Sequence, residues 1–283
     1  MKHKVSVLIN TLNEEKNLGN CLESVSSWAD EIIVVDMYSD DRTVEIAKRY
    51  GANVYMHERL GFADPARQFG LSKVKNQWVL VLDADEILSL KSPDFIDNLI
   101  SSNQGDVYWI GRENLMFGEV IRYSGWGAKE DVQARLFNKE MLSYGSKIHD
   151  FVHISDDARQ VRLNVQSIKL IHFNYLDISH FIEKMNRYTT IEAEQRYRSH
   201  TKICFLKAMA RCSTEFIKRY FVKRGYLDGF NGFKLSVLMS IYYFFVYIKL
   251  KEIYKKKNIN VKYIVEEEYK EVFNKYKSKD FDL

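Results

Sequence analysis

The chain has 283 residues, of which 46% are hydrophobic and 28% charged; these are ordinary globular values, which exclude wholesale disorder and suit one large domain or a domain with an appendage. Three scattered cysteines exclude a disulfide framework, and no pair has the CxxC spacing of a zinc site, so we expect a reducing compartment. The net charge of +4 conceals an acidic first half, residues 1–150 with 17 basic and 23 acidic side chains, and a basic remainder with 25 and 15.

The first 90 residues alternate strand and helix patterns. Four apolar runs predict strands, at Val5–Asn10, Glu31–Asp36, Asn53–His57 and Trp78–Leu82. Helical spacing falls between them, at residues 13–25, 43–50 and 66–75. Strands separated by helices at this spacing predict right-handed βαβ units. The expected fold class is therefore α/β, with an open and mostly parallel sheet.

Polar and acidic residues follow three of these strands. They are Thr11–Glu15, the segment from Asp36 to Thr43, and Asp83–Glu86. Open parallel sheets bind ligands at the carboxyl ends of their strands, so these residues indicate a site. No glycine-rich GxGxxG or GxxxxGK[ST] loop occurs at these turns, which argues against a phosphate cradled by bare backbone.

Asp83-Ala84-Asp85 is the most specific of these signals. Alternate carboxylates on an extended segment point the same way, and hard oxygen ligands of this kind suit Mg²⁺ or Mn²⁺. The alternative is the start of a helix, with Asp85 or Glu86 in its acidic first turn.

Three ordered motifs resemble the signature turns of the family-2 inverting glycosyltransferases. They are Thr11-Leu12-Asn13-Glu14-Glu15, Val34-Val35-Asp36-x-x-Ser39-x-Asp41-x-Thr43 and Leu82-Asp83-Ala84-Asp85-Glu86. A finer pattern is similar to the branch with lipopolysaccharide-core β-1,4-glucosyltransferases: Trp28-Ala29-Asp30-Glu31, Gly61-Phe62 and Arg135-Leu136-Phe137. The resemblance implies a GT-A catalytic domain over residues 1–175, Rossmann-like, with a mostly parallel sheet flanked by helices. Residues 176–283 would form a basic, aromatic, helical C-terminal region.

The resemblance also implies roles for individual residues. Asp83 and Asp85 match the DXD motif, which reaches the ribose and a divalent metal, Mn²⁺ or Mg²⁺, on the diphosphate; His149 is a further candidate for the metal. The implied contacts to a UDP-sugar donor are Thr11, Asn13, Glu14, Asp36, Ser39, Arg67, Asp83, Ala84 and Asp85. Two of these have ordinary alternatives, a turn cap for Asp36 and a solvated helix residue for Arg67. Gln68 stands where the branch usually has Asn.

Inverting transfer needs a general base that takes the proton of the acceptor hydroxyl. Asp150, in Ile148-His149-Asp150, lies where the branch has a His-Glu pair and is the favoured candidate. Asp131 is the competitor, because related enzymes also place an acidic residue near its strand. The alternative for either is a surface carboxylate, and for His149 a structural histidine.

The C-terminal part reads as helical beyond Asp177, with further helices near residues 202–223 and 230–257. Its longest apolar run, Leu235–Ile248, has 14 residues, fewer than the ~20 of a bilayer span, so we expect no transmembrane helix. The basic helices are either a cap on the catalytic domain or an attachment to an anionic membrane surface. The resemblance implies a lipid-linked or lipopolysaccharide acceptor, which favours the membrane, so we expect a cytoplasmic protein, peripheral on the inner face of the cytoplasmic membrane. No nucleic-acid motif accompanies the charge, and no such partner is expected.

The prediction is a metal-dependent inverting glycosyltransferase. It would move a hexose, glucose from UDP-glucose, onto a saccharide or lipid-linked acceptor such as lipopolysaccharide core. A polyprenyl-phosphate sugar synthase is the alternative enzyme, and a non-catalytic membrane-bound adaptor is the alternative of another class. Nucleotidyl transfer is weaker, because the glycine- and lysine-rich N-terminal loop of such enzymes is missing.

Overall fold

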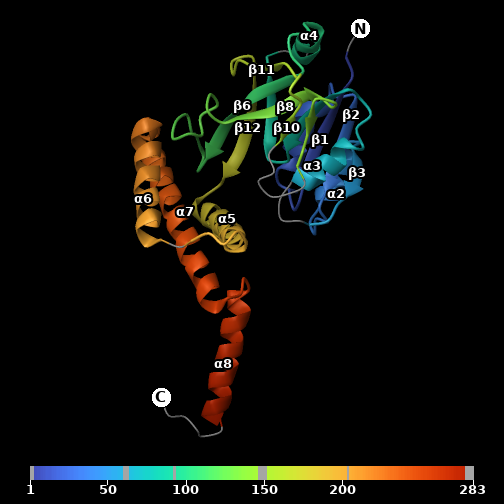
Figure 1. Cartoon of the computed structure of the whole chain (residues 1–283). Coiled ribbons are helices and arrows are strands. Elements are labelled where there is room, and N and C mark those ends of the chain that lie inside the picture. The colour runs from blue at the N-terminus through green and yellow to red at the C-terminus, as the bar shows by residue number, and fades with distance from the viewer. Residues whose placement is uncertain (1–2, 60–63, 92–93, 146–151, 203, 278–283) are drawn as a thin grey trace. The chain divides into compact units, whose positions relative to one another are not determined.

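The computed structural model describes residues 3–59, 64–91, 94–145, 152–202 and 204–277. The chain divides into two compact units, residues 1–174 and 175–283. The first contains the sheet and its flanking helices, and the second consists of helices (Figure 1).

The first part of the sheet consists of four parallel strands. They are β1 (Val5–Thr11), β2 (Glu31–Asp36), β3 (Asn53–Met56) and β4 (Trp78–Asp83). Their order is β3-β2-β1-β4. Asn10 pairs with Val35 on one side and Asp83 on the other, so β1, β2 and β4 end level with one another. The predicted α/β sheet is confirmed, and its strands end at one common edge.

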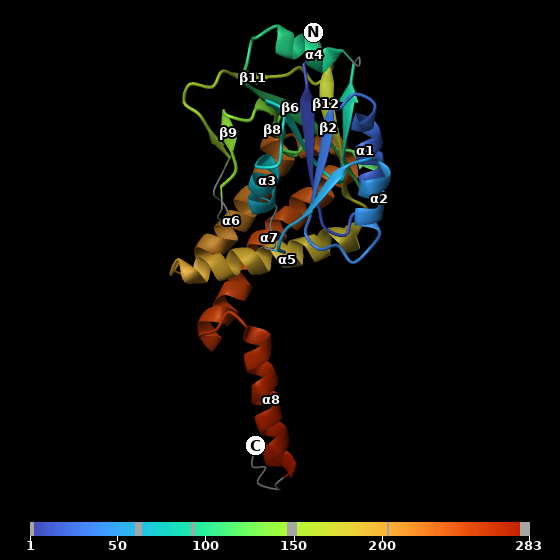
Figure 2. The ribbon, with the colours of Figure 1, turned by 90° about the vertical axis from the view of Figure 1, so that its right-hand side faces the viewer.

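Helices cover both faces of these strands, which is why the strands are nearly continuous apolar runs (Figure 2). They are α1 (Leu18–Ser26), α2 (Thr43–Arg49), α3 (Asp64–Leu71) and, further along, α4 (Phe95–Ser101). Helix α1 buries Leu18, Cys21, Leu22 and Val25, which share one face because they recur every three or four residues.

Helix α3 lies very close to the opposite face of the sheet. A Cβ atom added at Gly70 would lie 2.4 Å from Leu8 Cδ1 and 2.8 Å from Val35 Cγ2, so a side chain there would have to displace both. This close approach fixes the height of α3 above β1 and β2.

The rest of the sheet is mixed in direction. Its strands are β5 (Glu86–Leu90), β6 (Val107–Met116), β7 (Glu119–Val120), β8 (Val132–Asn138), β11 (Gln160–Arg162) and β12 (Ile168–Tyr175), and a separate hairpin pairs β9 (Leu142–Ser143) with β10 (His153–Ile154). Strand β8 runs antiparallel to both β4 and β6, and β12 runs antiparallel to β5. Because β5 begins at Glu86, the alternative of a helix starting there is wrong.

The second unit is helical over most of its described residues. Its helices are α5 (Ile178–Arg198), α6 (Phe205–Ile217), α7 (Gly229–Lys256) and α8 (Val261–Lys277), with a π-helical turn at Lys218–Val222 and a 3₁₀ turn at Gly225–Asp228 between α6 and α7. Both α5 and α6 pack against α7.

One helical stretch, Gly225–Lys256, is long and apolar enough to cross a membrane by length and composition alone. It is longer than the 14-residue run Leu235–Ile248, which Lys234 and Lys249 bracket. Only 22% of its most apolar 18-residue segment is buried. A core helix of a soluble protein can nevertheless be as long and as apolar. The absence of a transmembrane helix therefore stays a prediction.

Candidate active site

Asp36, at the end of β2, joins the turns that follow β1 and β2. Its buried Oδ1 accepts hydrogen bonds from Thr11 Oγ1 at 2.9 Å and Ser39 Oγ at 2.6 Å, and its Oδ2 accepts from Ser39 N at 2.7 Å. A buried carboxylate needs such donors to offset its lost hydration. In this structure Asp36 therefore has the contacts of a turn cap.

The same two turns are tied by Asn13 and Glu14. Asn13 N donates to Ser39 Oγ at 2.8 Å, and Asn13 Oδ1 accepts from Asp40 N at 2.8 Å. Glu14 N donates to Thr43 Oγ1 at 2.8 Å. Asn13 has a φ of 57°, a left-handed conformation that Asn tolerates better than most residues. The turns after β1 and β2 thus form one cross-linked rim at the sheet edge.

Asp83, the last residue of β4, lies between two arginines. Its Oδ2 is 2.5 Å from Arg135 Nη2, and its Oδ1 pairs with Arg67 Nη2. Arg135 also reaches Glu86 Oε1 at 2.8 Å, and Asp83 N donates to Glu86 Oε2 at 3.0 Å. The side chains of Arg135 and Glu86 are 5% and 0% exposed, so this cluster is part of the core.

The charges of this cluster set its protonation. Burial alone would raise the pKa of Asp83, but the cations of Arg135 and Arg67 hold that pKa well below its usual range. For Glu86, burial prevails over the attraction of Arg135, and its pKa is raised. Asp83 is therefore an anion whose charge the fold already balances.

Asp85 has a different neighbour, His172 on β12. Asp85 Oδ2 lies 3.3 Å from His172 Nε2, and His172 Nδ1 lies 2.7 Å from Asn114 Oδ1. The amide nitrogen of Asn114 donates to Trp126 O and Asp131 Oδ2, both at 2.8 Å, which fixes the amide orientation. Since Asn114 Oδ1 can only accept, His172 Nδ1 must carry a proton. In the neutral ring, Nε2 then presents a lone pair toward Asp85.

When the His172 ring is protonated, its contact with Asp85 is an ion pair, and when the ring is neutral a metal ion can lie between the two groups. Two ligands about 2.1–2.2 Å from one ion and at right angles lie about 3 Å apart, close to the Asp85–His172 spacing. The described residues contain no group of three or more His, Cys, Asp or Glu side chains that could hold a metal. Asp85 and His172 therefore fit a metal that takes its other ligands from water or substrate.

The carboxylate of Asp131, the second candidate base, accepts hydrogen bonds with all of its lone pairs. Arg112 donates to it through Nε at 2.8 Å and Nη2 at 3.1 Å, Asn114 at 2.8 Å and Gln133 at 3.0 Å. Burial would raise its pKa, but Arg112 and these amide donors hold the pKa of Asp131 below its usual value. A carboxylate so fully engaged is a poor acceptor for a substrate proton.

The remaining predicted residues are placed as follows. Asp150 and His149 lie outside the described residues. Ala84 is buried in the turn between β4 and β5. Arg67 has a side chain only 17% exposed, so the alternative of a solvated helix residue is wrong. Its neighbour Gln68 accepts a hydrogen bond from Tyr144 N at 2.8 Å.

The sequence alone did not indicate His172. It is a lone histidine in strand β12, without a motif. Lys169 and Asn174 in the same strand are also polar, and only the pairing of β12 with β5 brings His172 to Asp85.

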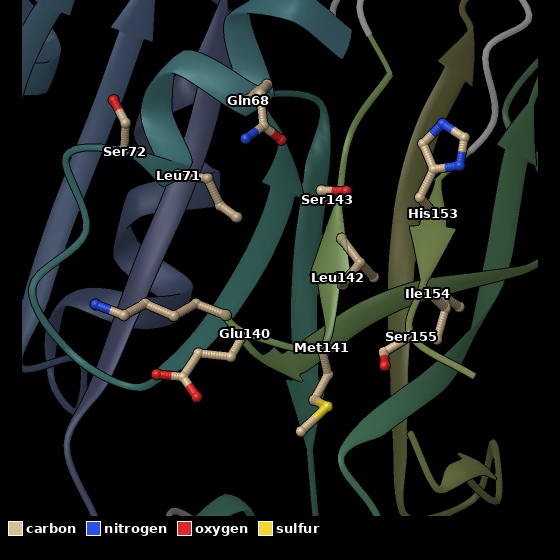
Figure 3. A pocket seen from close by; sticks show the side chains of 11 residues that line it. Gln68, Leu71, Ser72, Glu140, Met141, Leu142, Ser143, His153, Ile154 and Ser155 are labelled. Carbon is tan, nitrogen blue, oxygen red and sulfur yellow. The ribbon is translucent and has the colours of Figure 1, made fainter. Parts of the chain in front are cut away.

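A pocket of about 540 Å³ lies between α3 and the β9–β10 hairpin (Figure 3), next to Arg67 along α3. Gln68 lines it from the helix, and Ser143 and His153 line it from the hairpin. The pocket continues to Lys139. The backbone N–H of Lys139 donates a hydrogen bond to the carbonyl oxygen of Gln77, next to the start of β4. The pocket therefore extends along the face of the sheet, away from the carboxyl ends of the parallel strands.

The family model described as glycosyl transferase family 2 matches residues 6–153, more than half of the chain. The chain belongs to glycosyl transferase family 2. An uncharacterized glycosyltransferase of Rickettsia typhi is 30% identical over 267 residues, which cover 90% of each chain. The lipopolysaccharide core biosynthesis glycosyltransferase LpsC of Rhizobium meliloti is 27% identical and covers 88% of this chain and 92% of its own. Among solved structures, S. aureus TarS 1–349 in complex with UDP aligns with a TM-score of 0.46 and 15% identity over 90% of this chain and 92% of its own.

The family-2 match confirms the predicted family, enzyme class and GT-A fold. The strand ends that carry the family-2 motifs are the ones that the sheet brings level, at Thr11, Asp36 and Asp83. The roles of the individual site residues stay predictions.

Proposed function

We propose that this family-2 glycosyltransferase transfers a hexose from a UDP-sugar, glucose in the first instance, to a saccharide or lipid-linked acceptor with inversion at the anomeric carbon. The observation that supports this most is the Asp85–His172 pair at the end of β4, where a carboxylate oxygen and an imidazole nitrogen lie 3.3 Å apart. Beside it, the arginine-paired Asp83 completes the DXD segment.

Asp85 and His172 would hold a divalent cation, Mn²⁺ or Mg²⁺, and Asp83 would face the donor's ribose. When bound, such an ion stabilises the negative charge of a leaving diphosphate. Asn114 keeps the proton on His172 Nδ1 and so leaves Nε2 free to be a ligand, the usual arrangement of a metal-binding histidine. In this proposal His172 is the metal ligand, a role for which the resemblance suggested His149.

The nucleotide would lie on the rim formed by the turns after β1 and β2. Thr11, Asn13, Glu14 and Ser39 would line its pocket. Asp36 would act on the nucleotide chiefly by holding Thr11 and Ser39 in place, because its own oxygens are buried and occupied. Arg67, paired with Asp83, brings a guanidinium group to the same edge.

Asp150 would be the general base. Its carboxylate would take the proton of the acceptor hydroxyl while the hydroxyl oxygen bonds to the anomeric carbon and the bond from that carbon to the diphosphate breaks. UDP leaves with the bonding electrons. The saturated contacts of Asp131 support this choice, since Asp131 holds Arg112 and Asn114 in place instead.

A cell-surface glycan such as lipopolysaccharide core is the proposed acceptor. LpsC, which is similar to this chain over most of its length, bears the name of a lipopolysaccharide core biosynthesis enzyme. The basic C-terminal region, net +10 over residues 151–283, supports a location at the anionic inner face of the cytoplasmic membrane.

Calorimetric titration tests the donor and the metal together. UDP, UDP-glucose, UDP-galactose and UDP-N-acetylglucosamine are each titrated with Mn²⁺ and with EDTA. We expect Mn²⁺-dependent binding that Asp85→Asn and His172→Gln remove, whereas Asp157→Asn, an exposed carboxylate in the same unit, leaves it unchanged. Equal binding in Mn²⁺ and EDTA would refute the metal assignment. If no UDP, GDP or CMP donor binds, the adaptor alternative becomes the better one.

The acceptor class is tested by product formation. Polyprenyl phosphate and an oligosaccharide are offered in parallel with the donor found above. Transfer to the phosphate that survives Asp150→Asn would identify a polyprenyl-phosphate sugar synthase, because an ionised phosphate needs no base.

A further inference from the structure

The unit of residues 175–283 has a pocket of its own, about 370 Å³ in volume, formed by residues of α5, α6 and α7 and the segment before α6. Four basic side chains line it: Arg196, Lys202, Lys207 and Arg211. Among the described residues, no Asp or Glu lines it. A hollow lined by cations alone has a strongly positive potential and attracts an anion.

Three of these cations have no carboxylate partner among the described residues. Arg196 pairs with Glu192 at 2.5 Å, one helical turn away. In contrast, no carboxylate in the described part of the chain pairs with Lys202, Lys207 or Arg211. Most other basic clusters on these helices are interleaved with acids, so this concentration of unbalanced charge is local.

The pocket also holds its cations in position. The Arg211 guanidinium lies 4.2 Å from the centre of the Tyr243 ring, a cation–π contact that restricts the side chain. Lys207 is in the first turn of α6, a helix of 13 residues whose unpaired N–H groups add positive potential at that end. A guanidinium and ammonium groups arranged in this way suit the several acceptor oxygens of a phosphate better than a single carboxylate.

Exposed apolar side chains lie beside the basic ones. Phe205 and Leu206, at the start of α6 and adjacent in sequence to Lys207, are 53% and 76% exposed. Large apolar groups next to a cationic pocket match the border between lipid tails and headgroups.

We propose that the pocket lined by Lys202, Lys207 and Arg211 binds a phosphate group, as carried by an anionic lipid headgroup or by a soluble phosphate. The proposal does not rest on the sugar-transfer reaction, because every residue that lines the pocket belongs to residues 175–283, whereas Asp85 and His172 belong to the other unit.

The test uses the full chain without donor and with EDTA present, so that the glycosyltransferase site contributes nothing. Sedimentation with vesicles of phosphatidylcholine, with or without phosphatidic acid, measures lipid binding, and calorimetry with inorganic phosphate measures binding of the free ion. The variant Lys207→Gln/Arg211→Gln keeps residues with good helix propensity. The control, Lys251→Gln/Lys255→Gln, removes the same charge from exposed positions of α7 outside the pocket.

We expect binding to phosphatidic acid vesicles to fall about tenfold or more in the pocket variant and to change less than about twofold in the control. Lys202→Gln, which lies outside the helices, should weaken binding in the same direction without any risk to folding. Loss of vesicle binding with no phosphate binding identifies a lipid headgroup, and loss of phosphate binding with no vesicle binding identifies a soluble phosphate. Equal losses in the pocket variant and the control, or no binding of the wild type to either probe, would overturn the proposal. Since neither assay uses a sugar donor, a failure here is distinct from a failure of the proposed transferase.

Discussion

The carboxylate of Asp83 accepts from two arginines, whereas that of Asp85 faces His172 Nε2. The two residues belong to one DXD motif and are separated by a single alanine. Around Asp83 two arginines balance the carboxylate, and around Asp85 the neighbouring group is the His172 imidazole. The two ends of the motif therefore differ: Asp83 is paired within the protein, and in the proposed assignment Asp85 and His172 take a cation from outside. This difference predicts that substitutions at the two positions fail in different ways.

Asp85→Asn should have the largest effect. Loss of one ligand from a two-residue site should lower the rate of transfer from UDP-glucose at saturating Mn²⁺ by about 10³-fold or more. The midpoint of thermal unfolding should move by no more than a few degrees, because Asp85 balances no buried charge. An initial-rate assay and a melting curve check both. A large loss of stability at Asp85 would abolish the contrast with Asp83.

Asp150→Asn should have the second-largest effect. It should lower the rate of transfer about 10²–10⁴-fold and leave UDP affinity unchanged. The amide cannot take the acceptor proton but leaves the donor site intact. Rates and calorimetric UDP titration measure the two properties. The matched variant is Asp131→Asn, which should lower transfer much less. The reverse order would make Asp131 the base.

Arg135→Met should affect stability more than any other single change near Asp83. It leaves Asp83 and Glu86 as buried carboxylates without their shared cation, which costs about 3–5 kcal/mol in similar buried pairs. Urea denaturation measures the free energy of unfolding. Arg135→Lys, which keeps the charge but loses the fork geometry, should lose less. A neutral result for Arg135→Met would show that Asp83 is not balanced by the fold.

Asp131→Asn should have the smallest effect, visible in the pH dependence of stability. The folded-state pKa of Asp131 is depressed, so its contribution is present above the unfolded value of about 3.9 and is lost as pH falls through the folded value. The wild type should therefore lose more stability than the variant as pH falls below about 4. Urea midpoints at neutral and acidic pH measure this. Parallel pH profiles for the two proteins would contradict it.

The sequence predicted the parallel part of the fold well because that part is encoded locally. The apolar run Glu31–Asp36 and the stripe from Leu18 to Val25 carry their own periodicity, and the motifs follow their strands directly. The mixed part was less predictable. Strand β5 follows the DXD segment at once and is defined by its pairing with β12, about 80 residues later in the chain.

The site was predictable in its motifs but not in its partners. Asp83 and Asp85 were found from their spacing, yet their different environments depend on Arg135 and His172, which β8 and β12 bring to β4 and β5. Likewise, only the folded structure shows that the lone pairs of Asp131 are all occupied.

Gly70 has a consequence for how such a site is surveyed. With no side chain there, α3 lies against Leu8 and Val35, and this height sets the reach of Arg67, one helical turn earlier, to Asp83. A methyl group at Gly70 would lift the helix and displace a guanidinium that Gly70 never touches. In a mutational scan scored by activity, Gly70 would therefore rank among the functional residues, although its contribution is only the thickness of the gap between a helix and a sheet.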